Sequence, residues 1–448
     1  MTTTTTGPAP ASPGPGAPEA PVRDRADVRR QVRLVITFGL VLASLVVFAL
    51  LVDDPAFTYL LGEKRTAEFV PKDGNATYIS WGAVVIAAIA LVLAALDRFP
   101  RGWKGALLGI LVGLAFYAGF LMWAYTDQAE GGIQVFIANP IPGTIRIATP
   151  LVLGALAGCL CERAGVINIA IEAQFLSGAF FASVFSSIAY SSLVFIPVAL
   201  CAVFGLLGGV LAGVLIAAML GWFALRYRVN QVVLGVVLVA FATGLTSFLL
   251  GQIPSDHKET LNDPQVLEKI EIPVLADIPV VGDALFNQTL LVYLMYASVA
   301  LVTFLLFQTR WGLRVRAVGE HPKAADTVGI QVNRVRWQAV LLGGVFAGLG
   351  GAYYTVGSTG AFDREVSAGT GFIALAAVIM GRWHPVGATF AAVFFGFMWN
   401  LQNQLSFVQP VPGELLGAAP YLATIIAVAG FVGRVRPPAA DGEPYVKE

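Results

Sequence analysis

Long stretches without any charged residue dominate this sequence and restrict what it can fold into. Residues 173–225, for example, hold 53 consecutive positions without Asp, Glu, Lys or Arg. Only 12% of the chain is charged, about half the fraction found in ordinary soluble domains. A helix needs about 20 apolar residues to cross a bilayer, whereas a transmembrane barrel would show alternating segments of about ten residues. The pattern therefore predicts an all-α, polytopic integral membrane helical bundle.

Apolar segments along the chain predict 11 or 12 transmembrane or re-entrant helices. The long uncharged stretch must hold two crossings. The segment at 370–381 is short and runs into a turn at 381–385, so it fits either a half-helix or a re-entrant segment within the protein. The predicted segments are 34–52, 79–96, 105–125, 145–161, 167–190, 194–222, 231–250, 289–308, 338–356, 370–381, 386–404 and 419–433.

The distribution of basic residues predicts which loops face the cytoplasm. If the amino terminus lies inside and the segments alternate, 21 of the 28 Lys and Arg residues fall inside and 7 fall outside. Excess positive charge marks the cytoplasmic side of membrane proteins. The long loops 53–78 and 256–283 are acidic and fall outside. We therefore expect both termini to be cytoplasmic.

Composition divides the chain into four parts. Residues 1–33 open with a Thr-, Pro- and Ala-rich stretch that does not resemble a cleaved signal peptide, and we expect a disordered cytoplasmic tail there. Plain apolar segments within 34–140 predict an accessory three-helix membrane unit. Gly and polar residues enter the segments of 141–434, which we expect to be the functional core. Residues 435–448 are expected to form a second cytoplasmic tail.

One carboxylate and two amides lie at the start of segment 167–190. Asn168 and Glu172 are four residues apart and are expected to share a helix face, with Gln174 close by. An ionisable group within a span is costly and commonly faces a bundle interior or a water-filled cavity. These three residues are therefore candidates for a substrate pathway or its gate. Glu172 lies about 15 Å from the cytoplasmic end, however, and a structural hydrogen-bonding role stays equally open.

A second group of amides closes segment 386–404 on the expected outer side. Uncharged amides could bind a neutral polar ligand, and they are also typical of a helix terminus that is exposed to water. Asn400 and Gln404 are the candidates for the pathway in this group. Asn230 and Gln231, at the start of another segment, are explained by capping at the membrane interface.

Small residues at regular spacing predict where helices pack closely. Gly205, Gly209 and Gly213 follow each other at four-residue intervals, as do Gly344 and Gly348. Lipid provides no hydrophobic drive for helix association, so small residues that let backbones approach are favoured at helix contacts. The three cysteines all lie in apolar stretches and are interpreted as packing residues, and we expect no metal site.

A compact cationic segment lies between two long apolar stretches. Pro322 suits the first residue of a helix, and Gly329 suits the residue after its end. Ala324, Ala325 and Val328 are expected on the less polar side of this helix. Because so short a helix is unstable alone in water, either the bundle or a docked partner must hold it. The residues singled out here are Gly319, Glu320, His321, Pro322, Lys323, Ala324, Ala325, Asp326 and Gly329.

The motifs that the sequence lacks exclude several classes of function. The chain has no G-x-x-x-x-G-K-[ST] phosphate loop and no cluster of catalytic side chains. Carriers driven by protons or sodium often place several ionisable groups within the membrane, whereas Glu172 is nearly alone here. A transporter driven by ATP hydrolysis on another subunit explains both absences. A secondary carrier is the main rival, and a membrane enzyme or assembly factor is a weaker one.

Two motifs resemble those of a known family. Residues 165–174, GVINIAIEAQ, are similar to the G-V-x-N-I-x-I-E-G run of bacterial ABC importer permeases of the branched-chain amino-acid, ribose and nucleoside group. Residues 319–330, GEHPKAADTVGI, resemble the segment through which such permeases couple to their ATPase. Ala173 departs from the family's Gly. The resemblance covers about 145–430 and looks closest to nucleoside permeases, often labelled simple-sugar permeases.

The resemblance implies a particular assembly. The chain would be a permease subunit of a bacterial cell membrane, without enzymatic activity or cofactor of its own. Its partners would be two cytoplasmic ATPase subunits, a second permease subunit that is a sister chain, and an extracytoplasmic substrate-binding lipoprotein. Nucleosides are the expected substrates, and simple sugars and branched-chain amino acids remain alternatives. Residues 319–329 would be the coupling helix that contacts the ATPase.

Overall fold

The chain folds into two compact units. In the computed structural model, one unit holds residues 1–59 and 71–135 and the other holds 60–70 and 136–448. The predicted span at 419–433 lies outside the described residues, as does the amino-terminal stretch up to residue 24. The residues that the structure describes are 25–52, 56–62, 71–100, 102–126, 134–138, 140–192, 197–254, 257–278, 281–405 and 436–447.

The first unit consists of three helices, α1 (Arg25–Leu50), α2 (Ala76–Ala95) and α3 (Trp103–Thr126). Residues 25–33 were expected to be disordered, and that expectation is wrong because they form the first turns of α1. Hydrogen bonds hold these turns to the end of α2 and to the segment after it, since Gln31 Nε2 donates to the carbonyl of Ala95 at 2.7 Å and Arg30 Nη2 donates to that of Pro100 at 3.1 Å. Short strands precede α2 and follow α3, namely β1 (Ala56–Gly62), β2 (Pro71–Asn75) and β3 (Gln134–Ala138).

The second unit, which we call the core, is a bundle of long apolar helices. Within the membrane every backbone amide must be bonded inside the protein, which explains why these uncharged stretches are helical. Two of the helices continue into five-residue π-helical turns, η1 (Trp222–Arg226) and η3 (Thr355–Thr359). The helices are α4 (Pro140–Arg163), α5 (Ile171–Ser192), α6 (Val198–Gly221), α7 (Gln231–Gln252), α10 (Leu290–Gln308), α13 (Val332–Tyr354), α14 (Thr370–Met380) and α15 (Pro385–Leu405).

Across the part of the chain that the structure describes, eight helices are long and apolar enough to cross a membrane. This confirms the prediction of a polytopic helical membrane protein. The helix α14 spans 11 residues, or about 16 Å, which is roughly half of the hydrocarbon thickness. The segment at 370–381 is therefore a half-length helix.

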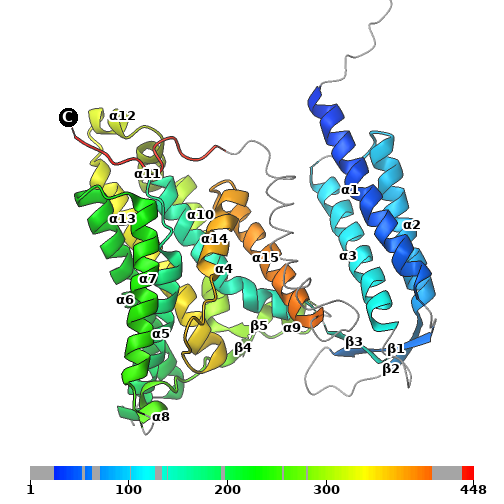
Figure 1. The fold of residues 1–448 in the computed structure, drawn as a ribbon, viewed down its shortest axis with the longest axis horizontal. Coiled ribbons are helices and arrows are strands. Elements are labelled where there is room, and N and C mark those ends of the chain that lie inside the picture. The colour runs from blue at the N-terminus through cyan, green and yellow to red at the C-terminus, as the bar shows by residue number, and fades with distance from the viewer. Residues whose placement is uncertain are drawn as a thin grey trace, which may run out of the picture. The chain divides into compact units, whose positions relative to one another are not determined.

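Short elements cover the two ends of the core (Figure 1). At one end, which we call the α12 end, lie α11 (Arg310–Glu320), α12 (Pro322–Thr327) and the carboxyl-terminal segment 436–447. The opposite end, which we call the α9 end, carries α9 (Gly282–Phe286) and the antiparallel strands β4 (Lys269–Glu271) and β5 (Asn287–Thr289). The one-turn helix α8 (Lys258–Leu261) precedes β4.

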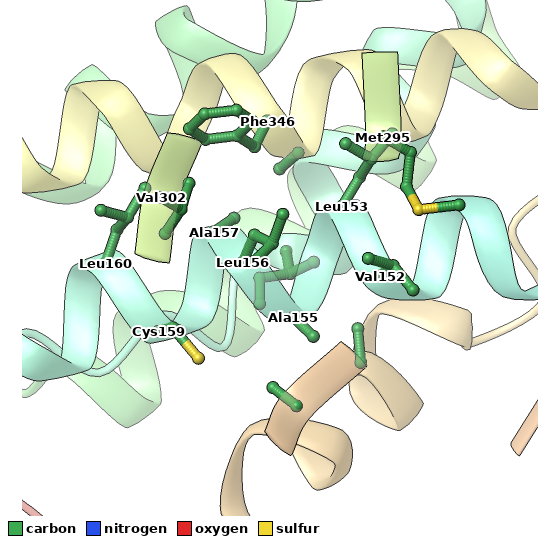
Figure 2. Packing of buried hydrophobic residues seen from close by; sticks show 14 of the residues in the cluster. Val152, Leu153, Ala155, Leu156, Ala157, Cys159, Leu160, Met295, Val302 and Phe346 are labelled. Atoms are coloured by element: carbon green, nitrogen blue, oxygen red, sulfur yellow. The ribbon is translucent and has the colours of Figure 1, made fainter. Parts of the chain in front are cut away.

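The helix α4 forms the centre of the core. Every residue from Ala148 to Glu162 is buried. Figure 2 shows Leu153 and Leu156 of α4 beneath Met295 of α10 and Phe346 of α13. A helix that is apolar on all sides is expected to lie inside a bundle, and α4 is covered by α10, α13, α14 and α15.

Glycines bring α6 and α13 into backbone contact, which confirms the prediction made from their spacing. A Cβ on Gly213 would lie 2.5 Å from both the carbonyl oxygen of Gly344 and the Cα of Gly348. In the same way, a Cβ on Gly348 would lie 2.5 Å from the carbonyl oxygen of Gly209. No side chain fits at Gly213 or Gly348 without a shift of the facing backbone.

Replacing Gly213 by Ala should therefore destabilise the core. Its methyl group would press on the backbone of α13, and overpacking of this kind costs about 1–3 kcal/mol. Denaturant unfolding of the protein in detergent micelles would measure the loss. The matched control is Gly244→Ala on α7, where nothing lies within 4 Å of the added Cβ and no loss is expected. Equal stability of the two variants would contradict the α6–α13 contact.

Candidate functional site

The two residues expected to share a helix face do not lie on one helix. The helix α5 begins at Ile171, and residues 164–170 form a turn between α4 and α5. Gly165 has a φ of +83° in this turn, a conformation that interrupts a right-handed helix. The prediction that Asn168 and Glu172 share a face is therefore wrong.

Glu172 holds the start of α14. Its Oε1 accepts hydrogen bonds from Ser367 Oγ at 2.6 Å and from the amide of Gly369 at 2.9 Å. Its Oε2 accepts one from the amide of Gly371 at 2.6 Å. The side chain belongs to α5 but satisfies amides at the amino terminus of α14, where the helix dipole favours a negative charge. We call this contact the Glu172 latch.

The amides of Asn168 and Gln174 are fully buried and face each other. Asn168 Nδ2 donates to Gln174 Oε1 at 3.2 Å and to Cys161 Sγ at 3.5 Å. The turn is therefore held to α5 by this side-chain contact, in addition to the backbone bond from the amide of Gln174 to the carbonyl of Ala170 at 2.9 Å. Gln231, treated as a capping residue from sequence, also holds this turn, because its Oε1 accepts from the amide of Ile167 at 2.7 Å. The capping role expected of Asn230 is confirmed, since its Oδ1 accepts from the amides of Val232 and Val233.

Asn400 does not join these residues. It is buried near the start of α4, where a Cβ on Gly143 would lie 2.2 Å from Asn400 Oδ1. Gly143 and Arg163 are 20 residues apart on one helix, or roughly 30 Å along its axis. The candidate pathway residues therefore form two separate groups. The side chain of Gln404 lies outside the described residues.

The short helix predicted in the cationic segment is confirmed. Pro322 is the first residue of α12, and Gly329 follows its end with a φ of +85°. The amide of Ile330 donates to the carbonyl of Ala325, and the amide of Gly329 donates to that of Asp326. This pair of bonds is the glycine-dependent helix end called the Schellman motif.

The predicted apolar side of α12 is only partly correct. Ala325 is buried, whereas Ala324 is exposed and Val328 is 75% exposed. Because α12 has only six residues, one buried alanine is all that faces the bundle. The exposed side chains include Lys323 on α12 and Val328, the residue that follows the helix.

The helix α11 was not predicted, because the sequence was interpreted there as a basic loop. Val315, Val318 and Gly319 are buried on one of its faces. A Cβ on Gly319 would lie 2.1 Å from the carbonyl oxygen of Arg163, so the end of α11 lies directly on the end of α4. The three-residue spacing of the two valines was the signal that could have indicated an amphipathic helix.

A turn between α14 and α15 also meets the end of α4. Trp383 Nε1 donates to a carboxylate oxygen of Glu162, and Arg163 Nε donates to the carbonyl of Trp383 at 2.9 Å. His384 stacks on Phe307 with ring centroids 4.6 Å apart. Burial, with a smaller effect of Arg163, lowers the pKa of His384. The half-length α14 is thus fastened at both ends, by the Glu172 latch and by this turn.

Arg336 was interpreted from sequence as a loop charge, yet it is the largest fully buried side chain among the residues that the structure describes. Its guanidinium donates to the carbonyls of Ala164 at 3.1 Å and Glu443 at 2.7 Å. Glu443 belongs to the carboxyl-terminal segment, which sequence reasoning left without a role. In the same segment, burial raises the pKa of Asp441 to about 7, and the charge of Arg336 opposes this rise.

The family is shown by comparison with known proteins. The family described as "Branched-chain amino acid transport system / permease component" matches residues 141–432. The guanosine ABC transporter permease protein NupQ of Bacillus subtilis is 39% identical over 68% of this chain and 96% of its own length.

Two further relatives are similar over nearly their whole length. The nucleoside ABC transporter permease protein NupC of Lactococcus lactis is 36% identical over 70% of this chain and 98% of its own. The putative glucose ABC transporter permease protein TsgC13 of Haloferax volcanii is 33% identical over 67% and 93%. No solved structure matches this chain.

The long apolar helices and these similarities define a membrane-embedded transport protein, a permease subunit and not an enzyme. The chain belongs to the permease family of branched-chain amino acid transport systems. The family match begins at residue 141, so the three helices of the first unit precede it.

The Glu172 latch predicts a loss of stability when its charge is removed. In Glu172→Gln, only one oxygen remains to accept bonds that two carboxylate oxygens now accept, and unsatisfied buried amides cost about 1–3 kcal/mol. Hydrogen exchange at the amides of Gly369 and Gly371 should accelerate in this variant. The matched control is Glu365→Gln, an exposed carboxylate in the same turn. Unchanged exchange at both glycines would contradict the latch.

Proposed function

We propose that this chain is the permease subunit of an ATP-driven importer for nucleosides. The observation that carries this proposal is the similarity, over nearly their full lengths, to relatives named as guanosine and nucleoside permeases. The chain forms the translocation pathway, and a separate ATPase supplies the energy.

The α12 end of the core faces the cytoplasm in this proposal. The excess of Lys and Arg in the segments predicted to be inside supports that orientation, as does the position of α12 with its exposed Val328. Two ABC ATPase subunits bind there, a sister permease chain completes the membrane part, and an extracytoplasmic lipoprotein delivers substrate at the α9 end. Both termini are cytoplasmic, and the membrane is that of a bacterial cell.

Movement of α12 reaches the membrane helices through contacts that converge on the end of α4. The ATPase displaces residues 319–329, and α11 carries the displacement because Gly319 lies on the carbonyl of Arg163. The turn after α4 leads directly to Glu172 and the start of α14. A partner shifts a protein from one conformation to another only when it binds the two with different affinities. Here the nucleotide state of the ATPase sets which conformation of the permease it binds more tightly.

The candidate pathway residues receive different roles. Asn168, Glu172 and Gln174 are buried and border the gate on the cytoplasmic side. Of the three, Glu172 sets the position of α14. Asn400 and Gln404 lie toward the outer side and border the pathway there. Both oxygens of Glu172 are occupied by hydrogen bonds, which supports a gate-positioning role over proton transfer and disfavours an ion-coupled carrier.

A second candidate substrate class is simple sugars. It is favoured by one observation, the 33% identity to a relative named as a putative glucose permease. Branched-chain amino acids are a further alternative, since the family description names them.

Uptake of radiolabelled adenosine and guanosine tests the proposal. Cells that lack the gene should lose uptake. In cells that keep the gene, unlabelled nucleosides should compete with the labelled substrate, whereas glucose and leucine should not. ATP depletion should stop uptake, whereas a protonophore should act only as far as it lowers ATP. Competition by glucose instead would move the substrate to sugars, and dependence on the ion gradient alone would remove the ATP-driven mechanism.

The exposed valine of α12 allows a test of the coupling helix. Val328→Arg removes no buried contact, so the chain should fold, but a charge in an apolar contact should weaken copurification of the ATPase about tenfold, equivalent to about 1.4 kcal/mol. Val328→Ile is the matched control and should bind normally. Normal copurification and uptake in Val328→Arg would exclude this surface as the ATPase contact.

A further inference from the structure

The carboxyl-terminal segment 436–447 connects two elements that are distant in sequence. Its Ala440 amide donates to the carbonyl of Gly319 at the end of α11, at 2.9 Å. Two residues later, the Gly442 amide donates to the carbonyl of Gly165 in the turn between α4 and α5, at 3.3 Å. The segment has no helix or strand of its own, so these contacts with the core define its course.

Arg336 makes the docking of this segment energetically important. Its Nη1 and Nη2 donate to the carbonyls of Glu443 and Ala440, at 2.7 and 3.5 Å, while its Nε donates to Ala164 at 3.1 Å. Two of these three acceptors belong to the carboxyl-terminal segment. A buried guanidinium that loses its partners is strongly destabilising, so release of the segment would expose Arg336 to that penalty.

Further contacts reach the coupling helix itself. The amide of Ala439 donates to Glu320 Oε2 at 3.2 Å, and Lys447 Nζ lies 3.9 Å from Asp326 Oδ1. The Lys447 side chain is 76% exposed, so this ion pair contributes little by itself. Together the contacts nevertheless place the segment against α11, α12, α13 and the α4–α5 turn at once.

We propose that residues 436–447 act as a strap that ties the coupling helix to the α4–α5 turn, with Arg336 as its anchor. The inference rests on the proposed function, because it assumes that an ATPase displaces α12. Such a displacement moves Gly319 and Glu320, and the strap passes it to Gly165. From there the chain runs six residues to the start of α5 and the Glu172 latch. The strap residues and Arg336 are positioning residues for coupling.

The test uses the complete transporter, purified with its ATPase and binding protein and reconstituted in liposomes. The unmodified complex is first assayed with nucleoside, glucose and leucine, and this step tests the proposed function. The strap is then tested with whichever substrate is taken up. The measured quantity is the ratio of ATP molecules hydrolysed to substrate molecules transported. A fault in folding or assembly would lower both rates together and leave this ratio unchanged.

Two variants disrupt the strap in different ways. A chain that ends at residue 435 lacks it entirely. Gly165→Ala keeps it but displaces it, because the added Cβ would lie 2.8 Å from both the Ala440 carbonyl oxygen and Arg336 Nη2. Gly102→Ala is the matched control, since Gly102 also has a positive φ, +70°, but nothing lies within 4 Å of its Cβ.

In both strap variants the ATPase should still copurify and hydrolyse ATP, while uptake falls about tenfold or more, so the ratio rises by that factor. Gly102→Ala should keep the ratio of the unmodified complex. If the truncated chain fails to fold, Gly165→Ala decides the result. Copurification of the ATPase reports assembly separately, so a Gly165→Ala complex that assembles and keeps the ratio of the unmodified complex would overturn the strap.

Discussion

Backbone contact between α6 and α13 is the constraint on which the rest of the core depends. Because lipid provides no hydrophobic drive for helix association, these helices gain packing energy only if they approach closely, and Gly209, Gly213 and Gly348 permit that approach. α13 then lies against α4 and α5 as well. Once α13 is fixed, Arg336 in its second turn is fixed too. Arg336 in turn positions the α4–α5 turn and the carboxyl-terminal segment, whose carbonyls it binds.

Much of the fold could be predicted from sequence because uncharged runs of the right length have few alternatives in a membrane. The half-length α14 and the helix α12 were visible from length and from the positions of Pro322 and Gly329. The helix α11 was missed because its charged residues outweighed two valines at helical spacing. The start of α5 was misplaced by four residues because the apolar stretch begins at Ile167, whereas residues 167–170 belong to the turn after α4.

The sequence identified residues of the candidate site but not the contacts between them. Glu172 stood out as a lone carboxylate, yet its partners Ser367, Gly369 and Gly371 follow almost 200 residues later and carry no signal of their own. Arg336 was hidden for the opposite reason. Its place beside other basic residues suggested a solvated loop, and only the tertiary structure shows that backbone carbonyls surround it.

All three cysteine side chains of the chain, Cys159, Cys161 and Cys201, are buried. Thiol reagents require an accessible thiolate, so the folded protein offers these reagents no native target. A single cysteine introduced at an exposed position, such as Ala439 or Val446, would therefore be the one reactive thiol. Fluorophores or spin labels could follow distances at the α12 end during transport in a chain that keeps its natural cysteines.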